Sequence, residues 1–370
     1  MAKPQFYVTA PQAERCILIG VVTAAEKPWQ VEIYLNELAA LAETAGATVV
    51  DRIVQHRPQL DPAFYIGRGK AAEIAERVID QKIDLIIFDN ELSSTQIKNL
   101  EQLIEVKVID RTALILDIFA AHARTREAKL QVEMAQLSYY LSRLTRQWSH
   151  LSRQVGGIGT KGPGETQLET DRRLIRRRLA NLKDELDKID EQDRTQRKKA
   201  KANINVAIIG YTNAGKSTLL NALTRADTLV EDKLFATLDT TVRRLNLDAG
   251  KIVLLSDTVG FIRKLPPTLI ASFKTTLAQT IDADILLHVV DVSNENFYEH
   301  ISVVNEILIE LKIDKKPVIL IMNKVDKISN NNILPKVKTL YPEALFVSAK
   351  KNLRLDRIKA GILEKINSTG

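Results

Sequence analysis

At 370 residues the chain is longer than a single hydrophobic core usually grows, so two or three domains are expected. Its composition, 45% hydrophobic and 27% charged, is that of an ordinary soluble globular protein. The formal net charge of +7 favours an anionic partner larger than a nucleotide.

The single cysteine excludes two kinds of cysteine-dependent architecture. Cys16 lies in the apolar run 16–22, which predicts a buried strand, so we expect neither a disulfide framework nor a cysteine-based zinc site. Residues 1–5 open no hydrophobic signal segment, and no apolar run reaches about 18 residues. We therefore expect a cytoplasmic protein that is not stably inserted in a membrane and is monomeric when free.

Residues 1–111 alternate apolar runs with stretches of helical spacing. The runs that predict buried strands are 16–22, 47–54, 83–88 and 106–109. The helical stretches between them are 31–45, 70–81 and 95–104, and Ser93 and Ser94 are placed to cap the last one. Strands that alternate with helices predict a small α/β domain with a parallel sheet.

One segment of this domain, Tyr65-Ile66-Gly67-Arg68-Gly69-Lys70, resembles a short phosphate loop. It follows no convincing strand, so two interpretations stay open. The favoured one is a glycine turn that leads into a helix. The other is an anion or nucleotide site formed by Gly67, Gly69 and Lys70.

Residues 112–200 carry the clearest periodicity of the chain. Apolar residues recur at alternating spacings of four and three, first at Leu130, Met134, Leu137, Leu141, Leu144, Trp148 and Leu151, then at Ile175, Leu179, Leu182, Leu186 and Ile189. Two such heptad helices joined by a short connection predict an antiparallel coiled-coil hairpin. Helices of about 25 residues would make an arm about 35–40 Å long.

A glycine-rich loop, 156–164, separates the two heptad helices. It holds five of the chain's 15 glycines, far more than a helical hairpin needs, so its backbone is suited to approach a partner closely. Basic residues flank it, and the candidates for contacts with nucleic-acid phosphates are Arg153, Lys161, Arg172, Arg173 and Arg176. The alternative is a flexible tip with a solvated charged face.

Residues 201–370 begin with a phosphate-binding pattern. Gly210-Tyr211-Thr212-Asn213-Ala214-Gly215-Lys216-Ser217 fits G-x-x-x-x-G-K-[ST], between the apolar run 206–209 and the helix-like stretch 219–223. The two glycines let backbone N–H groups point at phosphate oxygens, with a helix dipole behind them. Lys216 adds a charge on the terminal phosphates, and Ser217 offers a hydroxyl to Mg²⁺.

Two further motifs complete the phosphate site. A segment with few structural signals, 226–241, predicts a mobile loop that brings a threonine hydroxyl to Mg²⁺, and Thr237, Thr240 and Thr241 are all candidates. Asp257-Thr258-Val259-Gly260 follows a buried strand, 252–256. Asp257 would hold Mg²⁺ through water, and the Gly260 N–H would bond the γ-phosphate.

Two motifs predict that the base is guanine. Asn323-Lys324-Val325-Asp326 ends an apolar run, and the Asp326 carboxylate can accept both hydrogens from N1 and N2 of guanine. Adenine lacks that donor pair, and an unpaired carboxylate costs about 1–3 kcal/mol. Ser348-Ala349-Lys350 would place backbone N–H groups against guanine O6.

Phe261 occupies the position at which Ras-type GTPases keep a water-orienting glutamine. A phenyl ring cannot polarise water. We therefore expect slow intrinsic hydrolysis that needs either a partner or a repositioned group from elsewhere in the chain. The hypothesis is that the anionic partner at the arm stimulates turnover.

These motifs together resemble the HflX-type GTPases of the Obg–HflX group. The similarity extends over most of the chain and is carried by the segments 65–70, 88–93, 108–112 and 118–125, and by 162–173, which matches the most distinctive run of that family. The resemblance implies GTP-dependent binding to the large ribosomal subunit and its RNA, dissociation of stalled or heat-damaged ribosomes, and an arm near the peptidyl-transferase region. It also implies a secondary ATPase site in the N-terminal domain.

The resemblance selects Thr237 as the Mg²⁺ threonine. The expected catalytic residues are then Lys216, Thr237 and Gly260, with Mg²⁺ held by Ser217, Thr237 and, through water, Asp257. The expected GTP contacts are Gly210, Tyr211, Thr212, Asn213, Ala214, Gly215, Lys216, Ser217, Thr218, Phe235, Ala236, Thr237, Leu238, Asp239, Asp257, Thr258, Val259, Gly260, Asn323, Lys324, Val325, Asp326, Ser348, Ala349 and Lys350.

The predicted organisation is an N-terminal α/β domain at 1–111, a helical-hairpin arm at 112–200 and a P-loop GTPase domain at 201–370. Two other functions are alternatives to ribosome splitting. The first, a GTP-regulated RNA-binding switch in ribosome assembly or storage, remains an open alternative. A tRNA-modifying GTPase is disfavoured, because it would need a one-carbon cofactor domain or a reactive C-terminal cysteine, and the only cysteine is Cys16.

Overall fold

The structure is a computed structural model that describes residues 13–151, 163–199, 204–226, 234–235, 241–247, 250–265, 279–328 and 333–369. It divides into two compact units. The first comprises Met1–Ala121 and Tyr139–Ile175, and the second comprises His122–Ser138 and Arg176–Gly370. Each unit contains part of both helices of the predicted arm, whereas the sequence pattern treats the arm as a domain of its own at 112–200.

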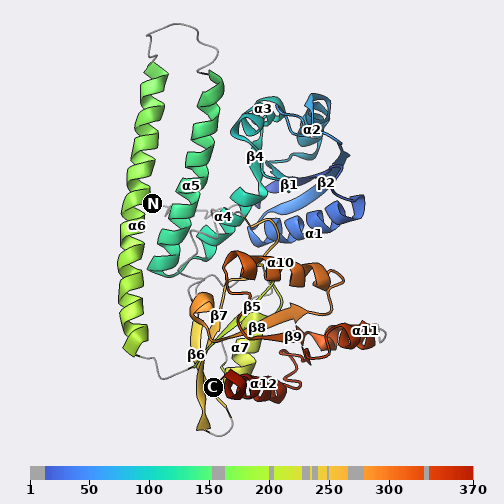
Figure 1. Ribbon diagram of the computed structural model, residues 1–370. Coiled ribbons are helices and arrows are strands. Elements are labelled where there is room, and N and C mark those ends of the chain that lie inside the picture. The colour runs from blue at the N-terminus through green and yellow to red at the C-terminus, as the bar shows by residue number, and fades with distance from the viewer. Residues whose placement is uncertain are drawn as a thin grey trace, which may run out of the picture. The chain divides into compact units, whose positions relative to one another are not determined.

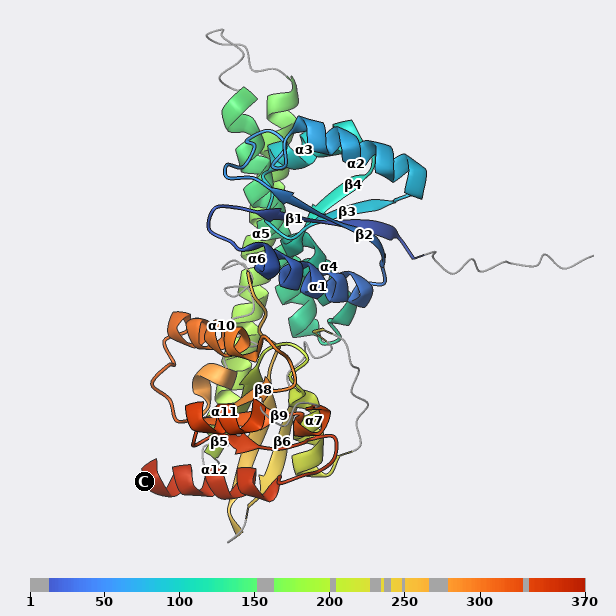
Figure 2. The same cartoon turned by 90° about the vertical axis from the view of Figure 1, so that its right-hand side faces the viewer.

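The first unit contains a four-stranded parallel sheet with the strand order β2-β1-β3-β4. Its strands are β1 (Arg15–Val22), β2 (Thr48–His56), β3 (Leu85–Phe88) and β4 (Lys107–Asp110). Its helices are α1 (Pro28–Thr44), α2 (Arg68–Gln81) and α3 (Ser94–Ile104). Helices α2 and α3 cover one face of the sheet and α1 covers the other (Figures 1 and 2). The α/β prediction for this region is confirmed.

The cap of α3 separates the roles of the two serines that precede it. Ser93 is the N-cap, because its side chain accepts a hydrogen bond from the Gln96 amide and the Gln96 side chain accepts one from the Ser93 amide. Ser94 is the first helical residue, and its hydroxyl donates to the Arg143 carbonyl at 3.0 Å. This second bond links α3 to the part of the arm that belongs to the first unit.

The residues after β4 form a separate helix that the heptad pattern does not predict. Helix α4 (Arg111–His122) buries most of its apolar side chains, among them Leu114, Ile115 and Phe119. It therefore belongs to a hydrophobic core and precedes the hairpin. The two long helices are α5 (Arg126–Leu151) and α6 (Pro163–Lys199).

Part of the predicted heptad seam is present between α5 and α6. Leu130, Leu182 and Leu186 form a buried cluster against which Met134, Leu137 and Ile189 pack. Two ion pairs flank the seam: Arg178 binds both carboxylate oxygens of Glu133 at 2.7 and 2.9 Å, and Arg126 contacts Glu185 at 3.0 Å. At 37 residues, α6 is longer than the helix that the sequence predicts. The glycine-rich loop lies almost entirely outside the described residues.

The second unit contains a six-stranded sheet with the order β10-β9-β8-β5-β7-β6, in which only β6 runs antiparallel to its neighbour. The strands are β5 (Ile204–Gly210), β6 (Thr241–Asn246), β7 (Ile252–Asp257), β8 (Ile285–Asp291), β9 (Val318–Asn323) and β10 (Leu345–Phe346). The helices on the sheet are α7 (Lys216–Thr224), α10 (Phe297–Glu310), α11 (Ile333–Leu340) and α12 (Asp356–Thr369). This is the P-loop GTPase architecture that the sequence predicts.

Separate apolar clusters cover the two faces of this sheet. Leu219 and Leu223 of α7 pack with Ile358 and Ile362 of α12 on one face. Val304 and Leu308 of α10 pack on the other face, beneath the strands β5 and β8. In the described part of the chain, no helix is both long enough and apolar enough to cross a membrane.

A buried carboxylate organises the end of β4. Asp110 is fully buried and accepts hydrogen bonds from the amides of Leu92 and Ala113, from the Tyr139 hydroxyl at 2.8 Å and from the Arg143 guanidinium at 2.5 Å. The Arg143 guanidinium also lies 3.9 Å from the centre of the Tyr139 ring. Burial, followed by the adjacent Asp110 charge, raises the pKa of Tyr139 and keeps it neutral. Asp110 thus joins the sheet to α5 through both a charge and a hydroxyl.

We predict that Asp110→Ala destabilises the first unit by about 3–5 kcal/mol, because it leaves the largely buried Arg143 without its carboxylate partner. The control is Asp51→Ala, which breaks the partly exposed Arg77–Asp51 pair of the same unit and should cost about 0–1 kcal/mol. Urea unfolding followed by the fluorescence of Trp29 and Trp148 measures both changes. Equal losses for the two variants would contradict a special role of Asp110.

Candidate nucleotide-binding site

The phosphate-loop pattern forms the turn between β5 and α7, and close packing explains its two glycines. Gly210 adopts a φ of 149°, and a Cβ on it would lie 2.2 Å from the Val289 carbonyl oxygen. Gly215 adopts a φ of 91° at the N-cap of α7, and a Cβ there would lie 2.4 Å from Nδ2 of Asn323. Any side chain at either position would push the loop away from its neighbours. The loop directly precedes α7, so its amides lie at the N-terminus of a helix, where N–H groups and the helix dipole favour a phosphate group.

Lys216 is buried at the base of this loop. Its ammonium group donates a hydrogen bond to the Tyr211 carbonyl at 2.9 Å. Burial lowers the pKa of Lys216 to about 8, while the nearby Asp257 carboxylate acts in the opposite direction. At pH 7 the Lys216 side chain is therefore protonated, and positively charged, in most of the molecules. A buried positive charge beside the loop amides is suited to phosphate oxygens.

Ser217 and Asp257 meet although they are 40 residues apart in the sequence. The Ser217 hydroxyl donates to Oδ2 of Asp257 at 2.5 Å. The parallel pairing of β5 with β7 sets this proximity, because Ile208 lies opposite Asp257 in the ladder. A hydroxyl and a carboxylate are oxygen ligands of the kind that Mg²⁺ takes together with phosphate and water. Among the described residues, no group of three or more His, Cys, Asp or Glu side chains could hold a metal ion.

Gly260 lies directly against the phosphate loop. A Cβ on Gly260 would come within 2.8 Å of the Thr212 Cα atom and 2.9 Å of the Lys216 ammonium nitrogen. Only a glycine fits at this distance. The backbone of Gly260 thus shares the space around the Lys216 charge, as a γ-phosphate contact requires.

The side chain of Phe261, which follows Gly260, points into the protein. It is 2% exposed and packs in the apolar cluster of Ile209, Leu286 and Val304. Its amide donates to the Gly210 carbonyl at 3.1 Å, and its carbonyl accepts from the Thr212 amide at 2.8 Å. A ring held in this way can neither polarise nor orient a water molecule.

Asn323 connects the two loops that would hold the nucleotide. It is 2% exposed, its Nδ2 donates to the Ala214 carbonyl at 2.9 Å, and its Oδ1 accepts from the Ala349 amide at 3.0 Å. The neighbouring Lys324 donates to the Asn213 carbonyl at 2.7 Å and pairs with Asp291 at 2.8 Å. The phosphate loop, the end of β9 and the Ser348–Lys350 segment are therefore tied together.

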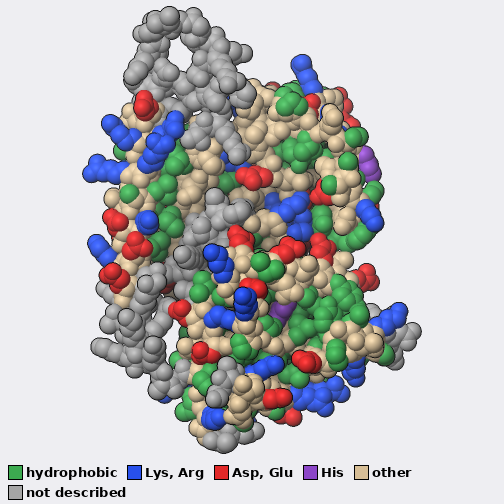
Figure 3. Space-filling view, in the orientation of Figure 1, with side chains coloured by type: hydrophobic (Ala, Val, Ile, Leu, Met, Phe, Trp, Pro, Cys, Tyr) green, Lys and Arg blue, Asp and Glu red, His purple; other side chains and the backbone are tan. Residues whose placement is uncertain are grey.

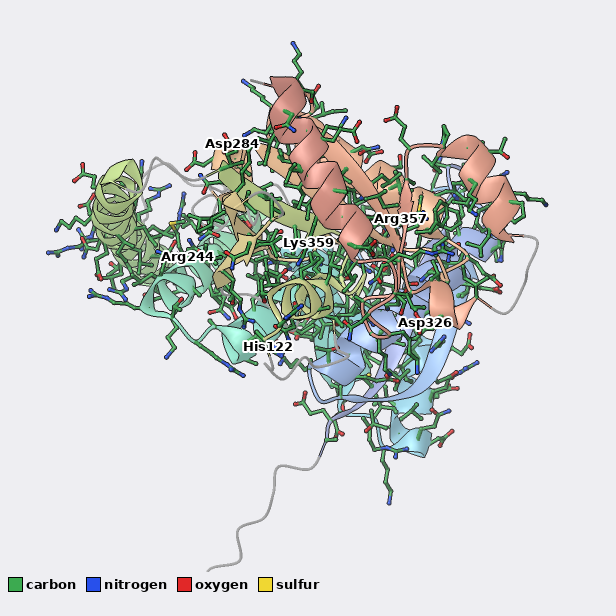
Figure 4. All side chains as sticks on the ribbon, turned by 90° about the horizontal axis from the view of Figure 1, so that it is seen from below. His122, Arg244, Asp284, Asp326, Arg357 and Lys359 are labelled. Carbon is green, nitrogen blue, oxygen red and sulfur yellow. The ribbon has the colours of Figure 1, made fainter. Side chains whose placement is uncertain are left out.

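Asp326 occupies the short 3-10 helix η2 (Val325–Lys327) after β9 and is exposed (Figure 4). It accepts a hydrogen bond from the Ser348 hydroxyl. That bond is the main cause that lowers the pKa of Asp326 and keeps it ionised. An exposed, oriented carboxylate at this place suits the two adjacent donors of guanine.

The threonine of the predicted mobile loop is not located. Thr237 and Thr240 lie outside the described residues, as do Ala236, Leu238 and Asp239. Thr241 begins β6, opposite Asp257 in the antiparallel ladder. Phe235 is 2% exposed. The selection of Thr237 stays a prediction.

Three contacts near the site involve residues whose roles the sequence motifs do not predict. Asp291 follows the buried strand β8 and pairs with Lys324. His300 of α10 stacks on the Tyr211 ring, with 3.8 Å between the ring centres and 7° between the planes. The Tyr211 hydroxyl accepts a hydrogen bond from the Arg263 amide at 3.0 Å. An acidic residue at the end of a buried strand could have indicated Asp291, but no local pattern indicates His300 or Arg263.

Only some of the residues predicted to contact RNA lie in the described part of the chain. Arg173 and Arg176 are exposed on α6, Arg172 is half-buried, and Arg153 and Lys161 lie outside the described residues. Lys and Arg side chains gather along the outer side of α6 (Figure 3). Arg178, next to them, is engaged with Glu133.

The glycine–lysine segment of the N-terminal domain has a structural explanation. Gly67 is the N-cap of α2 with a φ of 84°, and a Cβ on it would lie 2.2 Å from the Arg57 guanidinium. Lys70 pairs with Glu73 of the same helix at 2.7 Å, whereas a Cβ on Gly69 would meet nothing within 4 Å. These contacts support the glycine-turn interpretation.

We predict that Asp326→Asn shifts nucleotide preference from GTP toward xanthosine triphosphate, because the amide donates where the carboxylate accepted. A shift of about 5- to 150-fold in the ratio of the two dissociation constants is expected, since a mismatched donor costs about 1–3 kcal/mol. Competition against a fluorescent nucleotide measures it. An unchanged ratio would mean that Asp326 does not read the base.

We also predict that the second unit loses stability as the pH falls from about 6.5 to 5. Burial lowers the pKa of both His288 and His300 to about 4, so the unfolded chain binds protons in this window while the folded protein does not. Each histidine would contribute up to about 1.4 kcal/mol per pH unit. In urea titrations followed by circular dichroism, His300→Gln should reduce this slope, and an identical slope would contradict the assignment.

Three family models match successive parts of the chain: a GTP-binding GTPase N-terminal region at residues 32–120, a GTP-binding GTPase middle region at 122–200 and a 50S ribosome-binding GTPase domain at 205–324. The protein GTPase HflX of Flavobacterium psychrophilum is 50% identical over 313 residues, which cover 85% of this chain and 76% of that one. GTPase HflX of Escherichia coli is 42% identical over 358 residues, covering 96% and 83%.

Among solved structures, a GTP-binding protein of Sulfolobus solfataricus in complex with GDP is similar. It is 25% identical, with 96% of this chain and all of that one covered. The TM-score is 0.47.

Proposed function

Because the chain belongs to the HflX family of GTPases, we propose that it binds the large ribosomal subunit in a GTP-dependent way, dissociates stalled or stressed ribosomes, and hydrolyses GTP to GDP and phosphate. The supporting observation is the convergence of four separate segments on one place: the loop at 210–217, Asp257 with Gly260, Asp326, and Ser348. Each has the residue type that its role in a GTP site requires. The family model over residues 205–324 is that of a 50S ribosome-binding GTPase, which supports the choice of partner.

In the proposed mechanism the loop amides and Lys216 bind the β- and γ-phosphates. The Gly260 amide senses the γ-phosphate, and Asp326 selects guanine. Ser217, Asp257 and Thr237 would hold Mg²⁺, which neutralises charge on the phosphates when bound. These residues position the triphosphate and stabilise its charge, but the buried Phe261 ring leaves the attacking water without an orienting side chain from that position.

Partner stimulation follows as a proposal from the burial of Phe261. A group that orients the water must come from elsewhere, and the ribosomal particle is the natural source in this family. The exposed Arg173 and Arg176 on α6, with Arg172 beside them, are proposed to contact phosphates of ribosomal RNA. In this proposal GTP controls when the arm engages its target.

The first test compares GTP hydrolysis with and without purified large subunits. We expect slow turnover by the free protein and stimulation of at least tenfold by the subunits, with Lys216→Ala inactive in both conditions. Fast turnover of the free protein that no ribosomal particle changes would contradict partner stimulation.

Sedimentation distinguishes splitting from binding. Protein loaded with a non-hydrolysable GTP analogue should shift intact ribosomes toward free subunits, and the GDP-loaded protein should not. Co-migration with intact ribosomes without a shift would instead support an RNA-binding switch in assembly or storage.

We predict that joint replacement of Arg172, Arg173 and Arg176 by Ala weakens binding to large subunits. The logarithmic dependence of affinity on salt should flatten by up to about 1 for each phosphate that is no longer neutralised. The matched control is Arg126→Ala, which removes an arginine that is engaged in an ion pair with Glu185. If the triple variant and the control behave alike, α6 does not bind the RNA.

A further inference from the structure

Tyr211 has contacts that the phosphate-loop pattern does not require. The pattern accepts any residue after its first glycine, yet the side chain of Tyr211 is 5% exposed and lies between two other segments of the second unit. Its hydroxyl accepts from the Arg263 amide, and its ring stacks on His300. Its backbone carbonyl accepts from Lys216. One residue therefore contacts the loop lysine, the chain after Gly260 and helix α10.

The chain after Gly260 is held against the phosphate loop at three points. Two are backbone bonds of Phe261, with the Gly210 carbonyl and the Thr212 amide, and they form a short parallel bridge between Tyr211 and Phe261. The third is the bond from the Arg263 amide to the Tyr211 hydroxyl. The first two need no particular side chain on the loop, but the third exists only because residue 211 carries a hydroxyl.

His300 fixes the Tyr211 ring by stacking on it. The rings are almost parallel, so the imidazole covers a face of the phenol. Burial lowers the pKa of His300 to about 4, and the histidine is therefore neutral at physiological pH. A neutral imidazole can lie flat on the phenol ring. Stacked aromatic pairs contribute about 0.5–1.5 kcal/mol beyond their burial.

Gly260 is the residue that these contacts position. It precedes the bridged Phe261 and lies so close to Lys216 and Thr212 that it has no room for a side chain. An amide that is held in place before the ligand arrives binds with a smaller entropic cost. In the proposed mechanism the Gly260 amide contacts the third phosphate, whereas the loop amides and Lys216 serve the second phosphate as well.

We propose that Tyr211, supported by His300, is a positioning residue for the triphosphate: it holds the 260–263 segment so that the Gly260 amide is preset for the γ-phosphate. The inference rests on the GTP site of the proposed function and is independent of the ribosome. In this proposal Tyr211 helps the site to discriminate GTP from GDP, and His300 supports the Tyr211 ring.

The test is Tyr211→Phe, which keeps the ring and removes the acceptor of the Arg263 amide. Dissociation constants for GDP and for a non-hydrolysable GTP analogue are measured with the full chain by fluorescent-nucleotide titration. We expect about tenfold weaker binding of the triphosphate, equivalent to about 1.4 kcal/mol, with GDP within twofold of wild type.

Two further variants separate positioning from folding. His300→Ala removes support from the ring without altering the phosphate loop, and it should weaken triphosphate binding in the same selective way. Tyr298→Phe removes a hydroxyl from an exposed tyrosine on the same helix and should change neither affinity. Thermal unfolding is recorded for every variant.

The outcomes are distinct. Equal weakening of both nucleotides by Tyr211→Phe and His300→Ala, or no change in either, overturns the positioning role. If the wild-type protein binds neither nucleotide, the GTP site of the proposed function itself fails.

Discussion

The nucleotide site depends on one buried amide. Asn323 joins the Ala214 carbonyl to the Ala349 amide, and these two atoms belong to loops that are far apart in the sequence. Its side chain comes so close to Gly215 that no other residue would fit there. Because both ends of the amide are used, loss of the side chain would leave a buried carbonyl and a buried N–H without partners at about 1–3 kcal/mol each. The geometry of the phosphate loop and that of the Ser348–Lys350 segment are thus set jointly.

The second constraint on the nucleotide site is that its backbone segments lie very close to their neighbours. This closeness explains why three positions of the site have no room for a side chain. Gly210 lies against β8, Gly215 against Asn323, and Gly260 against Thr212 and Lys216. These contacts bring Lys216, the segment Asp257–Gly260 and the end of β9 within reach of one small ligand. The same closeness places Phe261 in the core, so the arrangement that favours phosphate binding also removes a side chain that would orient water. The proposed slow intrinsic hydrolysis would therefore have the same structural origin as the close packing around the loop.

In the first unit a buried carboxylate holds separate segments together, as the buried Asn323 amide does in the second unit. Asp110 receives four donors, two of them from side chains of α5, and Arg111 beside it pairs with Asp89 and Glu37. A carboxylate satisfied in this way holds the part of α5 that contains Tyr139 and Arg143 against the end of β4.

Local patterns in the sequence determined the elements and much of the site. Apolar runs predicted the strands, heptad spacing predicted the paired helices, and four short motifs predicted a GTP site, since each depends on neighbours within a few residues. The tertiary structure alone decided that α4 is a separate core helix, that Asp110 anchors α5, and that Gly67 serves a packing role against Arg57. It also placed His300 on Tyr211 and Asp291 beside Lys324. Such pairs leave no periodic signal, because contacts between distant segments depend on how strands and helices pack rather than on residue spacing.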